Sequence, residues 1–219
     1  MRHDQTNISS SPARGMLLPA VAVAAWLAVS GAGMWIVLAH EFRQGLAASA
    51  PTAWPEKSVI ERVKDRVTLV MLAHPHCPCT KASLDELSAI IARGKDLIDA
   101  HVLFIRPEGV SSDWTRTENW RKAEAIPGVH LLVDEKDAEA RLFGAKTSGQ
   151  VIVYDREGRL AFSGGITPSR AHTGDSEGVE AILSIARNGA AARPATAVFG
   201  CPLFGPRPAR AERSEPCRS

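Results

Sequence analysis

The chain has 219 residues, of which 45% are hydrophobic and 23% are charged, and it contains four cysteines. This length and composition suit one ordinary globular domain with additional segments. The formal net charge is only +2, and the sequence has one Tyr and six Phe. A nucleic-acid partner is therefore not expected, because the chain offers neither a strong positive charge nor many rings for base stacking.

The N-terminal part of the chain contains a long uncharged segment. Residues 1–15 are polar, whereas no charged residue occurs from Met16 to Ala39. A helix of that length spans about 36 Å at roughly 1.5 Å per residue, which is enough to cross a bilayer. A small-x-small sequence resembling a signal-peptide cleavage site follows, but Pro51 comes directly after it. We therefore expect a retained transmembrane anchor at residues 16–40 rather than a cleaved signal.

The charges around this anchor indicate its orientation. Arg2 and Arg14 precede the anchor, and positively charged residues favour the cytoplasmic side, so residues 1–15 are expected to be cytoplasmic. Residues 41–55 are rich in Ala, Ser and Pro and are typical of a linker. The domain that follows, at residues 56–190, is then expected to lie outside the cytoplasm.

The first part of this domain has the pattern of a strand–helix–strand unit. Apolar residues at helical spacing predict a short helix over 56–66, and a continuous apolar run predicts a buried strand over 67–73. A helical pattern covers 80–93 and a second strand pattern covers 98–106. A unit of this length predicts two parallel strands joined by a right-handed crossover.

The second part continues the alternation and then forms a hairpin. A polar helix, a third strand and a short helix are predicted in turn, and two strands joined by a Gly-containing loop follow, before a closing helix. These elements are expected at residues 111–125, 129–133, 137–143, 151–154, 159–165 and 179–186.

The most informative stretch lies where the first strand meets the following helix. Two histidines, His74 and His76, precede Cys77-Pro78-Cys79. Both cysteines are expected at or just before a helix N-terminus, where free N–H groups and the helix dipole favour a thiolate. Pro78 suits the first helical position, because its missing N–H costs nothing there.

A strand, a histidine turn, Pro-Cys and a helix resemble the active-site corner of the thioredoxin-like superfamily. The stretch DEKDAEARLFGAKTSGQVIVYDREGRLAFSGGI resembles the second half of its membrane-anchored, periplasmic thiol–disulfide branch. The whole chain is similar, more loosely, to bacterial membrane proteins labelled RedB-type. The resemblance implies an α/β fold with a thioredoxin-like mixed sheet flanked by helices, preceded by one transmembrane helix. It also implies a single-pass protein of the bacterial inner membrane whose domain acts on periplasmic protein thiols and disulfides.

Two departures from the family pattern affect the expected site. The family usually has Cys-x-x-Cys, and alignment of the Pro-Cys pairs puts His76 at the first cysteine and Cys79 at the second, with Cys77 between them. The family also has a cis-proline facing the cysteines, where alignment puts Gly149. The absence of a proline ring is expected to leave more room beside the sulfurs, enough for a substrate side chain or a metal ion.

Two later segments are candidates for completing the site. The loop after the hairpin is expected either to bring Arg170, His172 and Asp175 near the cysteines or to be solvated, with Asp175 capping the next helix. In the extension formed by residues 191–219, an apolar island at 198–204 contains a third cysteine, Cys201. This island is expected to dock on the domain, whereas residues 205–219, with Cys217, are expected to be disordered.

Thiol–disulfide exchange is the first function that these residues indicate. A disulfide between cysteines two positions apart is strained and therefore easily exchanged. Cys77, which is nearer the turn, is expected to be the more exposed sulfur and to attack a partner disulfide. Either Cys79 or Cys201 then resolves the mixed disulfide, and His74 and His76 supply positive charge that favours thiolate. This chemistry requires no cofactor.

Two other functions remain open. Imidazole and thiolate groups suit copper(I) or zinc, so the chain is alternatively a metal carrier or assembly factor. It is alternatively a thioredoxin-like binding module without catalytic activity. The side chains that would hold the metal are His76, Cys77, Cys79, His172 and Cys201, with His74 as a further ligand type.

Overall fold

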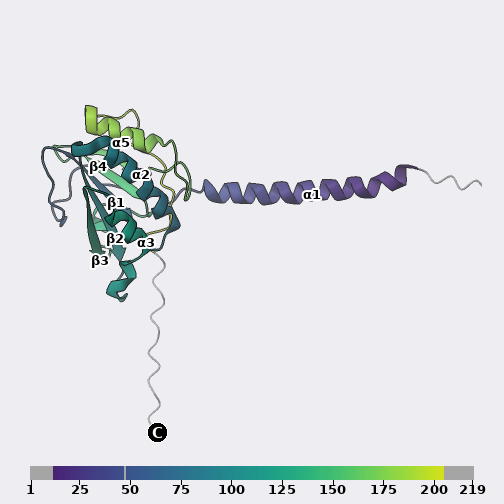
Figure 1. Ribbon diagram of the computed structural model, residues 1–219, viewed down its shortest axis with the longest axis horizontal. Helices are drawn as coiled ribbons and strands as arrows, with labels where there is room; N and C mark the ends of the chain where they lie inside the picture. The colour runs from purple at the N-terminus through teal and green to yellow at the C-terminus, as the bar shows by residue number, and fades with distance from the viewer. Residues whose placement is uncertain (1–11, 47, 205–219) are drawn as a thin grey trace, which may run out of the picture. The chain divides into compact units, whose positions relative to one another are not determined.

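The computed structural model describes residues 12–46 and 48–204, and the chain divides into two compact units, Met1–Phe42 and Arg43–Ser219 (Figure 1). In the described part of the first, residues 12–42, there is one long helix, and the second contains the five-stranded sheet. Arg2, and the end of the chain with Cys217, lie outside the described residues. The expectations placed on them stay predictions.

Helix α1, Pro12–Glu41, forms the described part of the first unit. Its portion from Leu18 to Glu41 has a mean hydropathy of 2.0, and its apolar side chains there are exposed. These properties come from the uncharged run noted in the sequence, and they give a helix long and apolar enough to cross a membrane. The expected N-terminal apolar helix is therefore confirmed.

The second unit is built on a five-stranded mixed sheet in the order β3-β2-β1-β4-β5. Its first three strands run parallel to one another, whereas β4 is antiparallel to β1 and to β5. The central strand β1 is buried on both faces, as its continuous apolar sequence predicts. The strands are β1 Val67–Ala73, β2 Ile98–Arg106, β3 Val129–Glu135, β4 Gln150–Tyr154 and β5 Leu160–Gly164.

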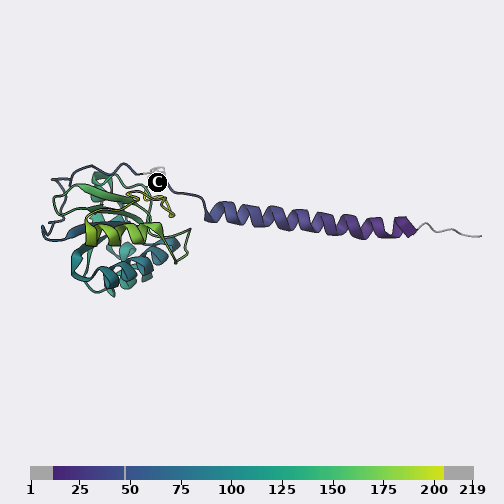
Figure 2. The same ribbon diagram turned by 90° about the horizontal axis from the view of Figure 1, so that it is seen from above.

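The helices cover the two faces of this sheet unequally. On one face α2, Pro78–Gly94, and α5, Glu177–Asn188, pack side by side over the alternate strand residues Leu69 and Met71 (Figures 1 and 2). On the other face Val70 and Leu72 pack against the short helix α4, Ala138–Leu142, and against loops. The α/β fold class with a mixed sheet flanked by helices is thus confirmed.

Two helices expected from the sequence differ in the structure. Residues 56–66 are irregular. Ile60 is buried whereas Val59 is 69% exposed, so the apolar residues of this stretch do not share one face as the expected helix requires. The Ser58 hydroxyl and the Val59 N–H instead donate to the Glu139 carboxylate, at 2.6 and 3.2 Å. These side-chain bonds replace the helical ones that the prediction required.

The polar helix expected over 111–125 is broken into a 3-10 turn, Ser112–Thr115, and helix α3, Glu118–Glu124. The break occurs at Thr117, whose extended backbone and side-chain oxygen cap α3 by accepting from the Trp120 N–H. A second 3-10 turn, Lys95–Leu97, links α2 to β2. The break at Thr117 brings the start of α3 beside the end of β1, where the cysteines lie.

Candidate thiol site

Cys77 and Cys79 lie at the N-terminus of α2, directly after the turn that leaves β1. Cys77 is the N-cap residue, with φ −86° and ψ 124°, and Pro78 occupies the first helical position. The Thr80 N–H donates to the Cys77 carbonyl at 3.1 Å and closes the first turn. The helix therefore begins where the proline placement predicts, with the N–H groups of its first turn near the sulfurs.

Both cysteines are buried, so the expectation that Cys77 is the more exposed sulfur is wrong. Cys77 is 1% exposed and Cys79 is 4% exposed. The physical reason is a second segment of the chain, residues 198–204, which we call the C-terminal segment. It lies across the beginning of α2 and the loop before β4, and it places Cys201 against Cys77.

The C-terminal segment is held on the domain by main-chain pairing. The Ser148 N–H donates to the Cys201 carbonyl at 2.8 Å, and the Leu203 N–H donates to the Lys146 carbonyl at 2.9 Å. Between these bonds Pro202 lies opposite Thr147 in an antiparallel bridge. Only alternate residues of an antiparallel strand bond to one neighbour, so the missing N–H of Pro202 leaves no gap.

The sulfurs of Cys77 and Cys201 are in contact here, and the pKa of Cys77 is low. The Sγ atoms of Cys77 and Cys201 are 2.9 Å apart, and all three cysteines are free thiols. The pKa of Cys77 is lowered to about 4, mainly by a hydrogen bond from the Cys79 thiol, against the opposing effect of burial. Hydrogen bonds from the side chain and backbone of Cys201 and from the backbone of Thr80 lower it further. Cys77 is therefore a thiolate at neutral pH.

The other two thiols keep their protons. The pKa of Cys79 is raised, first by its hydrogen bond to Cys77 and then by burial. The pKa of Cys201 is raised to about 11, first by burial and then by its hydrogen bond to Cys77. One thiolate thus accepts hydrogen bonds from two thiols, which is an arrangement suited to nucleophilic attack by Cys77.

The loop after β5 does reach the cysteines, through the backbone of Ala171 and the charge of Arg170. The backbone of Ala171, which has a left-handed φ of 56°, forms a hydrogen bond that lowers the pKa of Cys79. The charge of Arg170 lowers the pKa of Cys201, and its Nε atom donates to the Arg43 carbonyl at 3.1 Å. His172 is exposed, and its Nδ1 atom lies 2.6 Å from the Arg170 carbonyl. Of the expected side chains, Arg170 therefore acts on the site, whereas His172 is occupied within its own loop.

Of the two histidines before Cys77 that were expected to supply positive charge, His74 does not do so. Burial lowers the pKa of His74, and the His74 Nδ1 atom accepts a bond from the His76 N–H at 3.2 Å. His74 is therefore neutral at pH 7, and the prediction that it supplies positive charge is wrong. The Nε2 atom of His76 donates to the Trp114 carbonyl at 3.0 Å, and both imidazoles contact the Trp114 ring.

Gly149 occupies the expected place beside the cysteines, but the extra room is absent. Its φ is +83°, and a Cβ atom there would come within 2.7 Å of the Ser83 Oγ atom and 4.0 Å of the Phe199 carbonyl oxygen. The expectation of free space for a ligand is therefore wrong. The C-terminal segment and α2 fill it.

Asn119 is a buried residue of the site that the sequence analysis missed. Its Nδ2 group donates to the carbonyls of Pro75 and Cys77, at 2.9 and 3.0 Å. Thr117 donates a further hydroxyl bond to the Pro75 carbonyl at 3.0 Å. These bonds tie the turn that carries Cys77 to the start of α3. The sequence contains no signal for this, because the two segments are more than 40 residues apart.

A second missed group joins the same turn to the loop before β4. The Oγ atom of Ser148 accepts from the His74 N–H at 2.8 Å and lies 2.8 Å from the Thr80 Oγ1 atom. The Thr80 hydroxyl also donates to the His74 carbonyl at 3.2 Å. Ser148 and Thr80 are fully buried, so this network fixes the position of the loop with which the C-terminal segment pairs.

The arrangement of the histidines bears on the copper or zinc alternative. Within residues 12–46 and 48–204, no group of three or more His, Cys, Asp or Glu side chains has an arrangement that could hold a metal ion. The imidazoles of His76 and His172 are engaged in bonds to backbone carbonyls. The metal alternative stays a prediction.

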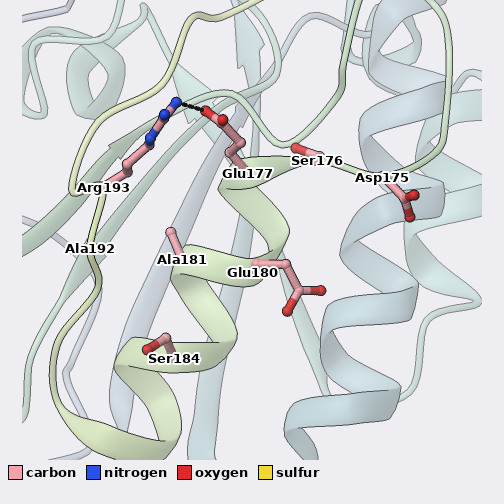
Figure 3. A pocket seen from close by; sticks show the side chains of 8 residues that line it. All are labelled: Asp175, Ser176, Glu177, Glu180, Ala181, Ser184, Ala192 and Arg193. Carbon is pink, nitrogen blue, oxygen red and sulfur yellow. Dashed lines mark hydrogen bonds and ion pairs between the residues drawn. The ribbon is translucent and has the colours of Figure 1, made fainter.

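Two of the depressions on the surface of the domain involve expected site residues. One, of about 340 Å³, adjoins Cys77 and lies between the turn at Pro75–Pro78 and the start of α3. The other, of about 620 Å³, is lined by residues at the start of α5 and by Arg193 (Figure 3). Asp175 lines this second depression, and the expectation that it caps α5 is wrong, because Ser176 accepts the bond from the Gly178 N–H.

Comparison with known proteins supports the fold and goes no further. No protein-family profile and no curated protein matches the chain. Among solved structures, the chain resembles an uncharacterised conserved protein from Geobacillus kaustophilus, with a TM-score of 0.54 at 19% identity, covering 77% of this chain and 95% of that one. It also resembles a hypothetical protein from Sinorhizobium meliloti 1021, with a TM-score of 0.54 at 16% identity, covering 74% and 94%.

A more distant likeness is to the pneumococcal exposed lipoprotein thioredoxin from Streptococcus pneumoniae, with a TM-score of 0.39 at 22% identity, covering 57% of this chain and 85% of that one. The strand order, the parallel and antiparallel pairings, and the cysteines at the start of the helix after β1 agree with the resemblance seen in the sequence. The second unit of the chain therefore has a thioredoxin-like fold.

Proposed function

We propose that this chain carries out thiol–disulfide exchange on extracytoplasmic proteins, with Cys77 as the nucleophile and Cys201 as the resolving thiol. The observation that carries the proposal is the 2.9 Å separation of the Cys77 and Cys201 sulfurs, at a Cys77 thiol whose pKa is lowered to about 4. A disulfide between these two needs only a small movement, whereas a bridge between Cys77 and Cys79 spans a single residue and is strained.

The reaction takes two exchange steps. The Cys77 thiolate attacks one sulfur of a partner disulfide, so that a Cys77–partner bond forms and the second partner sulfur leaves as a thiolate. Cys201 then loses its proton to that thiolate and attacks the Cys77 sulfur, which releases the first partner sulfur. The partner gains two electrons, and the pair Cys77 and Cys201 is oxidised to a disulfide.

Cys79 has a supporting role in this scheme. Its thiol donates to the Cys77 sulfur and keeps its own proton, since the pKa of Cys79 is raised. It stabilises the attacking thiolate without competing for the partner. The resolving role therefore belongs to Cys201, the cysteine whose sulfur lies 2.9 Å from that of Cys77.

The location outside the cytoplasm rests on the N-terminal helix. Leu18–Glu41 is long and apolar enough to anchor the chain in a membrane, and the thiol site belongs to the unit that follows it. In an oxidising compartment, partner disulfides are available as substrates. We place the site on the periplasmic side of the bacterial inner membrane, in line with the charge pattern before the helix.

The test uses the full chain in detergent, with Cys217→Ser in every variant so that only the site cysteines are counted. A chromogenic aromatic disulfide is added, and thiol release is followed with time. We expect Cys77→Ser to abolish the fast phase, and Cys201→Ser to accumulate a Cys77 adduct detectable by mass. An adduct that accumulates in Cys79→Ser but not in Cys201→Ser would transfer the resolving role to Cys79.

A parallel measurement addresses the alternatives to this function. Protein purified without chelator is analysed for copper and zinc, before and after Cys77→Ser. Stoichiometric metal lost with that variant would favour the carrier function. If the protein has neither reactive thiols nor bound metal, the binding module without catalytic activity is the remaining alternative.

A further inference from the structure

The surface beside Cys77 is occupied by the chain itself, through bonds that do not depend on side chains. The two bonds that join residues 200–203 to the loop before β4 link backbone groups only, Ser148 N–H to the Cys201 carbonyl and Leu203 N–H to the Lys146 carbonyl. Any extended polypeptide can offer the same carbonyl and N–H at the same spacing. The seat at residues 146–148 therefore recognises a strand as such, and Cys201 is the residue of that strand that meets Cys77.

We infer that residues 146–148 are the surface on which partner proteins bind, and that a partner does so by displacing residues 200–203 and presenting its own cysteine where Cys201 now lies. This inference rests on the proposed function and names its substrate class. The partner is an extended segment whose disulfide-bonded cysteine reaches the Cys77 sulfur. The Cys77 sulfur lies against the Cys201 sulfur, so a partner cysteine can take the place of Cys201 only after the segment has left.

The seat also specifies the residues on either side of the partner's cysteine. A Cβ atom on Gly200 would lie 1.9 Å from the Ser148 carbonyl oxygen, so the position before the cysteine requires glycine. The position after it tolerates proline, since Pro202 is exposed and bonds to nothing on the seat. Two positions after it, Leu203 is buried among the apolar residues beneath the sheet. The preferred segment is Gly-Cys-x-apolar.

The segment then returns to complete the reaction. After Cys77 attacks the partner disulfide, the chain holds a Cys77–partner bond and the other partner sulfur has left as a thiolate. As residues 200–203 reoccupy the seat, Cys201 loses its proton, the Cys77–Cys201 bond forms and the Cys77–partner bond breaks. The same movement that releases the partner sulfur also removes the partner strand. A dithiol reductant then restores both thiols by reducing the Cys77–Cys201 disulfide.

The test measures which peptides react with Cys77 in the full chain carrying Cys217→Ser. The probe is the octapeptide Ala-Val-Phe-Gly-Cys-Pro-Leu-Phe, with its cysteine linked by a disulfide to a chromogenic aromatic thiol. The matched control peptide replaces leucine by its α-hydroxy acid, so that an ester oxygen stands where the leucine N–H would donate to the Lys146 carbonyl and no group is added. We expect the control to react about fivefold more slowly, the effect of one backbone hydrogen bond. Equal rates for the two peptides would overturn the inference.

A pair of protein variants tests the displacement. Gly200→Ala introduces a contact with the Ser148 carbonyl and loosens the C-terminal segment, whereas Gly33→Ala, in α1, meets nothing within 4 Å. We expect Gly200→Ala to raise the rate with the octapeptide several-fold and Gly33→Ala to leave it unchanged. An unchanged rate in Gly200→Ala, with an unchanged melting temperature of the domain, would overturn the inference. If the small aromatic disulfide also fails to react with Cys77, the proposed function itself fails, and the two failures are thereby distinguished.

Discussion

The two sides of Cys77 are built differently. On the α3 side, the half-buried Thr117 and the buried Asn119 donate to backbone carbonyls of the turn that carries Cys77. On the other side, residues 198–204 contact the loop before β4 through backbone bonds that another strand can replace. The first contact depends on particular side chains and holds the thiolate in place, while the second depends mainly on an extended backbone, with Gly200 and the buried Leu203 as the residues that fit it. A site of this kind combines a fixed nucleophile with an exchangeable cover.

The largest effect on stability is expected when a side chain that holds the α3 side of the site is removed. Asn119→Ala leaves the carbonyls of Pro75 and Cys77 buried without their amide donor, and we expect a loss of about 2 kcal/mol or more in the free energy of unfolding. Urea denaturation followed by circular dichroism measures it. Glu124→Ala, at the exposed end of α3, is the control. A loss below about 0.5 kcal/mol for Asn119→Ala would show that the α3 side is not the rigid one.

The packing beneath the C-terminal segment is tested at Gly149, which lies against Ser83 and the Phe199 carbonyl. Gly149→Ala combines a left-handed φ of +83° with a contact 2.7 Å from the Ser83 Oγ atom, and we expect it to cost roughly 1–3 kcal/mol of stability. Ser83→Ala removes the contact but not the backbone strain. The double variant should therefore recover only part of the loss. Full recovery would mean that the strain at this position is negligible.

The thiol donors on the two sides of the Cys77 sulfur are expected to differ in strength. Cys79→Ala removes the larger of the two side-chain bonds that lower the pKa of Cys77, and Cys201→Ala removes the smaller. A bond to a charged group is worth about 1.5–3 kcal/mol, so the Cys77 pKa should rise by about one pH unit or more in Cys79→Ala and by less in Cys201→Ala. Titration of the thiolate absorbance near 240 nm gives both values. The reverse order would contradict the assignment of Cys79 as the main donor.

The low pKa of Cys77 also makes stability depend on pH. Between pH 4 and roughly 8.5, the folded protein holds a thiolate and the unfolded chain binds a proton at the same group. The unfolding free energy contributed by Cys77 therefore rises with pH across this window and is lost as the pH falls through about 4. Reduced wild-type protein and Cys77→Ser should differ in slope over this range. Parallel curves would contradict a native thiolate.

The smallest effect is expected where the chain approaches the exchangeable segment. Arg193 and Glu177 form an exposed ion pair at the second depression, just before the chain runs along β5 toward residues 198–204 (Figure 3). Exposed pairs of this kind contribute little, so Arg193→Ala should change the unfolding free energy by at most about 0.5 kcal/mol. It should leave the reaction rate of Cys77 unchanged. A rate increase comparable to that of Gly200→Ala would extend the exchangeable region to Arg193.

Much of the fold could be predicted from the sequence because local patterns carry it. The continuous apolar run of β1 and the helical spacing in α2 indicated their elements to within a few residues. The helix expected at 56–66 failed because Val59 and Ile60 are adjacent apolar residues that tertiary packing separates. Spacing alone does not say which member of such a pair is buried.

The site was less predictable because its contacts join distant parts of the chain. The Cys-Pro-Cys motif identified the helix start, but the burial of Cys77 depends on Cys201, 124 positions later. The neutrality of His74 follows from its burial and from the bond that it accepts, neither of which is visible in the residue type. Asn119 stood in a polar stretch with no motif, so only the three-dimensional structure brings it to the Cys77 carbonyl.

The main-chain pairing of residues 146–148 also bears on how this part of the gene can change over evolutionary time. Backbone bonds are insensitive to most side-chain replacements, so Phe199 and Pro202, which are not fully buried, are free to vary. Gly200 is restricted by its contact with Ser148, and Cys201 by its sulfur. Related chains should therefore keep a glycine–cysteine pair near the C-terminus within an otherwise variable stretch, and that pair would reveal the exchangeable strand in sequences with no detectable similarity elsewhere.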